Sequence, residues 1–272
     1  MAKHRGKWNE AVFHKYIREG RGQGVGESYT PWILIQNFAS RGMVSRVQGA
    51  KTGRVHHLMS NLETSLFFIL DWSDEILDIR EQFPLLELRT AVEIAEKAQI
   101  KYPYDPQSGF PYVMTSDFYI QTVDEPMIIS VKTSSDLDNF RVREKLEIER
   151  RYWSHHGIKW RIVTEKEIDN VKARNIEWLS QAKNLELFGL SQDIQAQCCS
   201  YFEFHYSYQP MFLSNLLKSV ETEFRLDPGM GMNIYKHLAY WKRIKVDVNK
   251  EVNFASFMDS TAYLRGASSG CQ

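Results

Sequence analysis

The stretch MTSDFYIQTVDEPMIISVK, residues 114–132, indicates how this chain folds. Two strand-like runs, residues 114–120 and 127–132, flank a short polar turn at residues 123–126. Two such runs around a short turn are typical of a β-hairpin. We expect the hairpin to bring Asp117 and Lys132 close together at one edge of a sheet.

A carboxylate and a lysine on such a hairpin form the arrangement with which metal-dependent nucleases of the restriction-endonuclease type build their site. Hydrolysis of a phosphodiester needs an activated water and neutralised charge on the phosphoryl oxygens, and Mg²⁺ supplies both. Mg²⁺ prefers oxygen ligands, usually one or two carboxylates with waters and substrate. Asp117 is therefore a candidate metal ligand, and Lys132 would lie near the attacked phosphate. The pattern also fits ordinary strand-edge charges, with Lys132 protecting the edge.

Residues 61–72, which precede the hairpin, have the apolar spacing of a helix. Ser60 is placed to cap this helix, and Glu63 three residues later completes the pattern of a capping box. If the helix packs over the hairpin, Glu63 supplies a second carboxylate to the metal. Alternatively, Glu63 serves only the cap or the helix dipole.

Up to about residue 165 the chain alternates predicted helices and strands. This is an α/β order, and it predicts a mixed sheet with flanking helices. Besides the hairpin and the helix at 61–72, we expect helices at residues 9–19, 90–99 and 137–155 and strands at 76–83 and 158–164.

The remainder of the chain has a different pattern, so we place a domain boundary near residue 166. Four helices are expected, at residues 166–183, 191–204, 211–225 and 230–239. Two strands are expected to follow, at residues 241–248 and 252–257. Helices followed by a hairpin suggest a winged helix. Residues 1–165 would thus be the catalytic domain, and residues 166–272 a winged-helix-like domain that binds DNA or a partner protein.

Charge is unevenly distributed along the 272 residues, although the formal net charge is zero. Residues 1–60 contain ten Lys or Arg against three Glu, which makes this segment +7 and the remainder −7. A basic segment of this kind is expected of a protein that grips phosphates, although a solvated surface has the same composition. The glycine run at residues 20–26 lacks the Lys-Ser/Thr of a P-loop, so we expect a flexible basic loop there.

The composition also argues against disulfide and zinc sites, and against a membrane or secreted location. Cys198, Cys199 and Cys271 fit neither a disulfide framework nor zinc spacing, and a reducing cytoplasm is the expected location. The chain lacks an apolar stretch near the roughly 20 residues of a membrane span, and the N-terminus lacks the apolar core of a signal peptide. The histidine pairs at 56–57 and 155–156 lack partners at metal spacing, so we expect them at the surface.

Several longer stretches resemble the TnsA family, the endonuclease subunit of heteromeric cut-and-paste transposases. The resemblance covers about residues 15–180 and includes IREGRGQG at 17–24, KTGRVHHL at 51–58, LDIREQFPL at 77–85, EKLEIERRYW at 144–153 and NIEWL at 175–179. It implies a restriction-endonuclease-like catalytic domain, a C-terminal winged-helix domain, and magnesium-dependent cleavage at the 5′ ends of the transposon strands.

The resemblance also implies roles for individual residues. The catalytic acids of the family fall on Glu63 and Asp117, and its lysine falls on Lys132. A further family acid matches Glu149, which by its spacing alone also fits a salt-bridged helix face.

One position departs from the family pattern, because Ser130 stands where the family has an acidic or amide residue. A hydroxyl is a weaker magnesium ligand than a carboxylate, and the backbone carbonyl of Val131 could supply another oxygen. The expected metal ligands are therefore Glu63, Asp117, Ser130 and Val131.

The partners implied by the resemblance are transposon-end DNA, a TnsB-like transposase subunit that cuts and joins the 3′ ends, and a TnsC-like AAA+ ATPase regulator. A stand-alone repair or restriction nuclease is an alternative, and cutting of plain DNA by the chain alone would favour it. A non-catalytic DNA-binding adaptor is a second alternative, supported mainly by Ser130.

Overall fold

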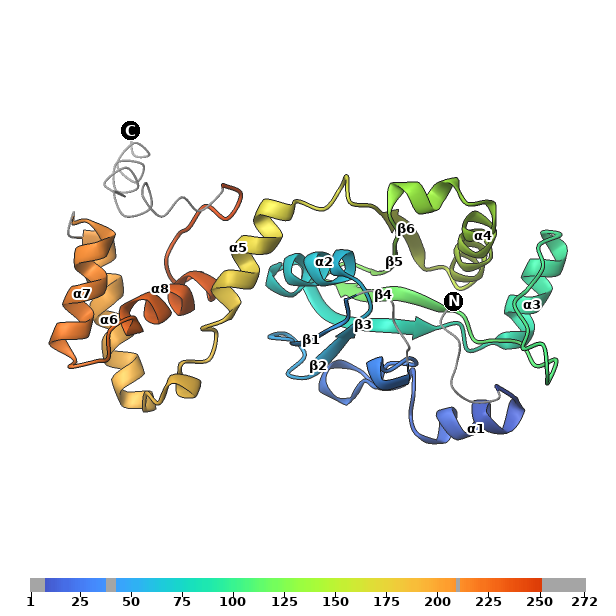
Figure 1. The fold of residues 1–272 in the computed structure, drawn as a ribbon, viewed down its shortest axis with the longest axis horizontal. Coiled ribbons are helices and arrows are strands. Elements are labelled where there is room, and N and C mark those ends of the chain that lie inside the picture. The colour runs from blue at the N-terminus through green and yellow to red at the C-terminus, as the bar shows by residue number, and fades with distance from the viewer. Residues whose placement is uncertain (1–7, 38–42, 209–210, 251–272) are drawn as a thin grey trace. The chain divides into compact units, whose positions relative to one another are not determined.

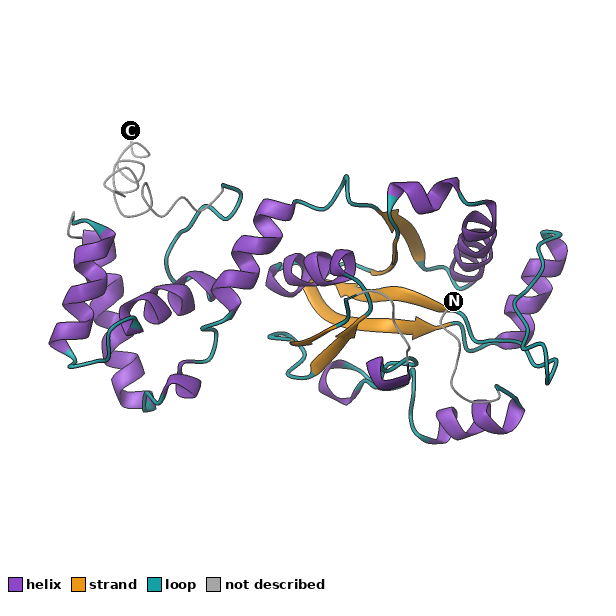
Figure 2. Ribbon diagram, in the orientation of Figure 1, coloured by secondary structure: helices purple, strands orange, loops and turns teal. Residues whose placement is uncertain are grey.

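The computed structural model describes residues 8–37, 43–208 and 211–250, and it divides into two compact units, residues 1–169 and 170–272. The N-terminal unit contains every strand among the described residues, whereas the described part of the C-terminal unit is helical (Figure 2).

A four-stranded mixed sheet forms the centre of the N-terminal unit, in the order β3-β4-β5-β6 (Figure 1). Strands β3, β4 and β5 are antiparallel neighbours, whereas β5 and β6 are parallel and are joined through α4. This confirms the mixed α/β fold and fits a restriction-endonuclease-like arrangement. The elements of the unit are α1 (Glu10–Arg18), β1 (Ser45–Gln48), β2 (Val55–Leu58), α2 (Asn61–Trp72), β3 (Ile76–Pro84), α3 (Leu88–Lys97), β4 (Thr115–Thr122), β5 (Pro126–Val131), α4 (Phe140–His155) and β6 (Lys159–Val163), with short 3₁₀ helices at Gly26–Ser28, Ile35–Asn37 and Ser134–Asp138.

Side chains alternate between the two faces along each strand, so apolar side chains project from both faces of the sheet. Helices pack against both of these faces. On one face, Phe67 of α2 packs in a cluster with Phe118 and Ile129. On the other face, α3 and α4 contribute Ala95 and Trp153 to a second cluster. Burial of these apolar groups stabilises the layers at about 25 cal/mol per Å² of apolar surface removed from water. The sheet thus fixes the positions of α2 and α4 relative to the hairpin.

The glycine run is packed, contrary to the expectation of a flexible loop. The N–H of Gly22 donates to Thr30 O at 2.6 Å, and its Cα lies so close to Pro84 that a side chain would collide with the proline ring. The guanidinium of Arg21 lies 3.5 Å from the centre of the Tyr16 ring and pairs with Glu19. Arg21 is therefore buried within the unit, so the basic excess of residues 1–60 is not all presented to solvent.

The C-terminal unit contains α5 (Asn170–Ser180), α6 (Gln192–Tyr208), α7 (Leu213–Glu223) and α8 (Met230–Tyr240), with a 3₁₀ helix at Leu185–Phe188. These helices confirm the four that were predicted, with shifted ends. Helix α8 contacts α5, α6 and α7 and buries most of its residues. It is the central helix of the unit, so it is not available to enter a DNA groove.

The predicted strand at residues 241–248 is wrong, because the structure has turns and irregular backbone there. Its alternating apolar residues Ile244 and Val248 are buried. The side-chain amide of Asn175, on α5, donates to the carbonyl oxygens of Val248 and Lys250 at 2.8 and 2.7 Å. A side chain thus replaces the strand partner that we expected. The second predicted strand, residues 252–257, lies outside the described residues, and the winged helix is not confirmed.

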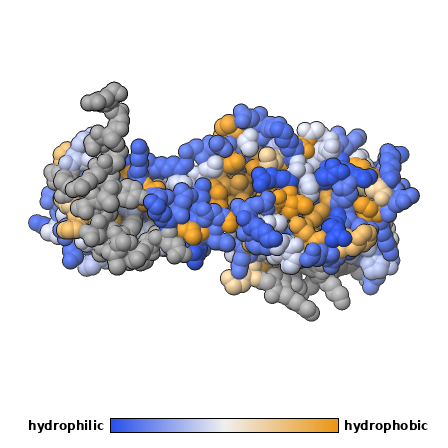
Figure 3. All heavy atoms as spheres, turned by 90° about the horizontal axis from the view of Figure 1, so that it is seen from above, coloured by the Kyte–Doolittle hydropathy of each residue, from blue (hydrophilic) through white to orange (hydrophobic). Residues whose placement is uncertain are grey.

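The surface has an ordinary mixture of polar and apolar groups. In the view of Figure 3, hydrophilic groups cover much of the visible surface, with apolar groups interspersed among them. Within the described residues, every helix is too short or too polar to cross a bilayer.

Candidate active site

The β4–β5 hairpin brings Asp117 and Lys132 into contact, as the sequence predicted. Lys132 Nζ donates to Asp117 Oδ2 at 2.8 Å. The regular pairing of β4 with β5 ends at Phe118 and Ile129, and beyond it the N–H of Val131 donates to the same Asp117 oxygen at 2.6 Å. The carboxylate therefore accepts a hydrogen bond that a strand partner would otherwise accept, which fixes its position between the two strands.

The ammonium of Lys132 donates hydrogen bonds to two oxygen acceptors. Besides Asp117 Oδ2, it donates to the carbonyl oxygen of Val131 at 2.7 Å. Burial alone would lower the pKa of Lys132, but the charge and hydrogen bond of Asp117, with the charges of Glu149 and Glu63, raise it. The side chains of Lys132 and Asp117 remain 30% and 14% exposed, so both can meet a substrate from solvent.

Glu63 lies in the first turn of α2, within range of the charges of Asp117 and Lys132, and it also completes the predicted cap. Ser60 Oγ accepts the N–H of Glu63 at 3.1 Å and donates to its Oε1 at 3.0 Å, while Met59 N–H donates to Oε2 at 2.9 Å. Each carboxylate oxygen keeps a further lone pair. The capping and metal-binding interpretations of Glu63 are thus compatible, since the cap holds the carboxylate in place.

Charge repulsion connects Glu63 with Asp117. The side chain of Glu63 is buried, and burial together with the negative charge of Asp117 raises the pKa of Glu63 to about 7. Hydrogen bonds from Met59 and Ser60 and the charge of Lys132 oppose this shift. A carboxylate whose proton affinity is raised by a neighbouring negative charge is expected to attract a cation.

Ser130 is engaged on the α4 side of β5. Its hydroxyl donates to Glu149 Oε1, and Trp160 Nε1 donates to the same oxygen at 3.0 Å. Burial raises the pKa of Glu149, against the hydrogen bonds from Ser116 and Ser130. The hydroxyl oxygen of Ser130 also accepts from Trp160 Nε1 at 3.2 Å, so Ser130 connects Glu149 and Trp160 to the hairpin. Its role as a magnesium ligand stays a prediction.

The chemistry of these donors fits a hard divalent cation. The two carboxylates of Glu63 and Asp117 and the Val131 carbonyl are all oxygen donors, and Mg²⁺ is commonly bound by one or two carboxylates with waters and substrate. Within the described residues, no three or more His, Cys, Asp or Glu side chains form a cluster able to hold a metal ion. A zinc-type cage is therefore not present in this part of the chain, whereas a hydrated cation fits.

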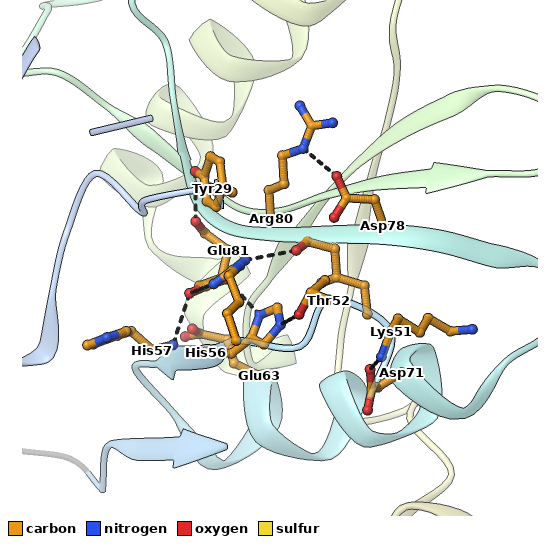
Figure 4. A network of polar contacts seen from close by, with 12 residues as sticks. Tyr29, Lys51, Thr52, His56, His57, Glu63, Asp71, Asp78, Arg80 and Glu81 are labelled. Atoms are coloured by element: carbon orange, nitrogen blue, oxygen red, sulfur yellow. Dashed lines mark hydrogen bonds and ion pairs between the residues drawn. The ribbon is translucent and has the colours of Figure 1, made fainter. Parts of the chain in front are cut away.

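A buried network of polar groups joins β2 to β3 (Figure 4). Arg54 binds Glu81 of β3 with two of its guanidinium nitrogens, Nη1 and Nη2, at 2.9 and 2.6 Å. His56 Nδ1 lies 2.7 Å from Glu81 Oε2, and His56 Nε2 lies 2.7 Å from the Thr52 hydroxyl. Although burial alone would raise the pKa of Glu81, hydrogen bonds from His56 and Arg54 hold it at about 2.

This network corrects the prediction for the first histidine pair, because His56 is fully buried instead of lying at the surface. The N–H of the next residue, His57, also donates to Glu81. These hydrogen bonds join β2 to β3. Strand β2 ends at Leu58, shortly before Ser60, which caps α2. Met59 and Ser60, which follow β2, donate hydrogen bonds to the Glu63 carboxylate. Sequence patterns gave no local signal for the network, since Glu81 lies 27 positions from Arg54.

Two sequence families match this chain. Residues 73–165 match the family described as "TnsA-like endonuclease N terminal", and residues 167–248 match "TnsA endonuclease C terminal". The transposition protein TnsA of transposon Tn7 from Escherichia coli is 38% identical over 253 residues, which cover 92% of this chain and 90% of that protein. The first match includes Asp117, Lys132 and Glu149, whereas Glu63 precedes it.

Proposed function

The chain belongs to the TnsA endonuclease family, and from that membership we propose that it uses Mg²⁺ to nick the 5′ strands at transposon ends. It is a DNA endonuclease and a transposase subunit. Endonucleases of this type generally depend on a divalent metal. The observation that carries the finer proposal is the convergence of the Asp117 carboxylate, the Val131 carbonyl and the Lys132 ammonium, with Glu63 close by.

In this proposal Glu63, Asp117 and the Val131 carbonyl hold the cation. Ser130 contributes through its hydrogen bond to Glu149, which connects α4 to the hairpin. The cation, when bound, supplies an activated water and offsets charge on the phosphoryl oxygens. Lys132 provides a positive charge beside the attacked phosphate, and its bonds to Asp117 and Val131 orient it before substrate arrives. The helix cap already holds the Glu63 carboxylate, so binding of the cation requires little rearrangement of this side chain.

The partners are proposed from the transposition role of the relative. They are transposon-end DNA, a TnsB-like subunit that acts on the 3′ strands, and a TnsC-like AAA+ ATPase. We assign partner-protein binding to the C-terminal unit, because α8 is buried within its helical core and cannot serve as a groove-reading helix. Residues 1–169 would then carry the cleavage chemistry.

A strand-specific cleavage assay tests the proposed function. End DNA labelled on either strand is incubated with the chain in Mg²⁺, with and without the partner transposase subunit. We expect cuts on the 5′ strand that require Mg²⁺ and depend on the partner. Robust cutting of unrelated DNA by the chain alone would favour a stand-alone nuclease, and cuts confined to the 3′ strand would contradict the assignment.

Mg²⁺ is expected to raise the melting temperature more at pH 8 than at about pH 5.5. The pKa of Glu63 is about 7 in the folded chain against an ordinary 4.5. Stability from this raised pKa is complete below about 4.5 and is lost as the pH rises through about 7, because the folded state binds the proton more tightly. A bound cation offsets the repulsion that appears when the proton leaves. Thermal unfolding with and without Mg²⁺ at both pH values measures this effect.

Two variants make the pH experiment specific. Glu63→Gln should lose the pH-dependent part of the Mg²⁺ effect, because the variant side chain carries no titrating group. Glu75→Gln, at an exposed position, should behave like the parent. An Mg²⁺ shift of equal size at both pH values in the parent would contradict the involvement of Glu63.

A further inference from the structure

Lys145 lies on α4 four positions before Glu149, so both residues share one face of the helix. Glu149 accepts a hydrogen bond from the hydroxyl group of Ser130. Val131 and Lys132 follow Ser130 directly in the chain. This face of α4 is therefore directed towards the end of β5 that carries the candidate active site. Lys145 is one helical turn from the residue that makes that contact.

Lys145 has no ion pair or hydrogen bond with any other residue that the structure describes, and its side chain is half-buried. The four other basic residues of α4 are all engaged. Their partners are Glu144 for Arg141, the Leu137 carbonyl for Arg143, and Glu147 for both Arg150 and Arg151. Lys145 thus differs from its neighbours, which have the salt-bridged pattern typical of a solvated helix.

The surroundings of Lys145 repel a positive charge. Burial lowers its pKa, and the nearby charges of Arg141 and Lys132 lower it further. Lys145 is thus within range of the charge of Lys132. A cation that is partly desolvated and surrounded by cations is stabilised when an anion arrives, and DNA phosphate is the anion that this enzyme meets.

We propose that Lys145 binds a backbone phosphate of the DNA strand that is cut, next to the phosphate attacked beside Lys132. The inference rests on the proposed function for the location of the cut strand. It assigns to Lys145 a direct contact with substrate but no part in proton transfer. Lys145 and Lys132 would together neutralise successive phosphates and place the scissile bond over Asp117.

DNA binding without cleavage provides the first test. Binding of end DNA by the full chain is measured in EDTA over a range of salt concentrations. We expect Lys145→Ala to weaken binding by roughly tenfold to a hundredfold, and to reduce the slope of log affinity against log salt by about one. Lys145→Arg should restore both values, because it retains the charge. Lys145→Gln keeps most of the side-chain stem and should reproduce the loss if the alanine variant folds poorly.

A matched control separates a phosphate contact from a general change in charge. Lys97→Ala removes one charge from an exposed position at the end of α3 in the same unit, and should leave binding near the parent value. Parent affinity and salt slope in both Lys145→Ala and Lys145→Gln would overturn the proposal, as would an equal loss in Lys97→Ala.

Cleavage kinetics provide a separate outcome. In the strand-specific assay, Lys145→Ala should raise KM by a factor similar to the loss in binding, while kcat changes little, because the contact exists before the chemical step. An unchanged KM with a strongly reduced kcat would overturn the substrate-binding role. If the parent chain does not nick the 5′ strand, the proposed function fails, whereas the binding experiment still decides whether Lys145 contacts phosphate.

Discussion

Replacement of Asp117 by alanine is expected to reduce nicking of transposon-end DNA by a factor on the order of a hundred or more, while the protein remains folded. The carboxylate is the point at which the Val131 N–H and the Lys132 ammonium converge, and it is a proposed ligand of the cation. Without it, the cation loses a charged ligand and Lys132 loses the group that orients it. Single-turnover cleavage of labelled end DNA with the partner transposase present measures the effect.

The same hairpin offers a matched control for Asp117. Asp124 is exposed in the turn between β4 and β5, so Asp124→Ala removes the same charge from the same element away from the site. We expect the control to nick at the parent rate. Circular dichroism and partner binding should be retained in both variants. Undiminished nicking by Asp117→Ala would contradict the assignment of the hairpin to the active site.

Replacement of Glu81 by alanine is expected to lower the free energy of unfolding by about 3–5 kcal/mol, because it leaves a buried charge without its partner. Arg54 donates two hydrogen bonds to this carboxylate, and His56 and the His57 N–H also contact it. Chemical denaturation followed by circular dichroism measures the loss. Glu96→Ala, at an exposed position on α3, is the control and should change stability little.

The Glu81 network should also contribute to the dependence of stability on pH. The pKa of Glu81 is about 2 in the folded chain, below its ordinary value of 4.5. Stability from a lowered pKa is present above about 4.5 and is lost as the pH falls towards 2, since the unfolded state takes up the proton first. The Glu81→Ala variant should lose less stability than the parent between these values. Equal acid sensitivity in the two proteins would contradict the ionised, hydrogen-bonded state of Glu81.

The hairpin and α2 could be predicted from the sequence because their signals are local. Two strand-like runs around a short polar turn indicated the hairpin, and the spacing of Ser60 and Glu63 indicated the helix start. The structure has β4 and β5 at these runs and the cap at Ser60. The meeting of Asp117 with Lys132 followed from the short turn between them. Local pattern was therefore sufficient for that part of the candidate site.

The features that the sequence did not predict depend on partners that are distant along the chain. Strands β1 and β2 have four residues each, too few for a clear periodic signal. His56 was expected at the surface because it lacks a partner at metal spacing, and its actual partner Glu81 lies 25 positions away. The apolar alternation of Ile244 and Val248 predicted a strand, yet it reflects packing in a helical unit. In each case tertiary contacts outweigh the local preference.

The two halves of the candidate active site form through contacts of very different range. Asp117 and Lys132 are 15 positions apart on one hairpin, so closing that loop costs little entropy. Glu63 reaches the site only when α2 docks on the completed sheet through residues such as Leu66 and Phe67. If Glu63 and Asp117 share the cation as proposed, a nascent or partly unfolded chain holds only part of that site. We therefore expect DNA cutting to be confined to folded copies of the chain.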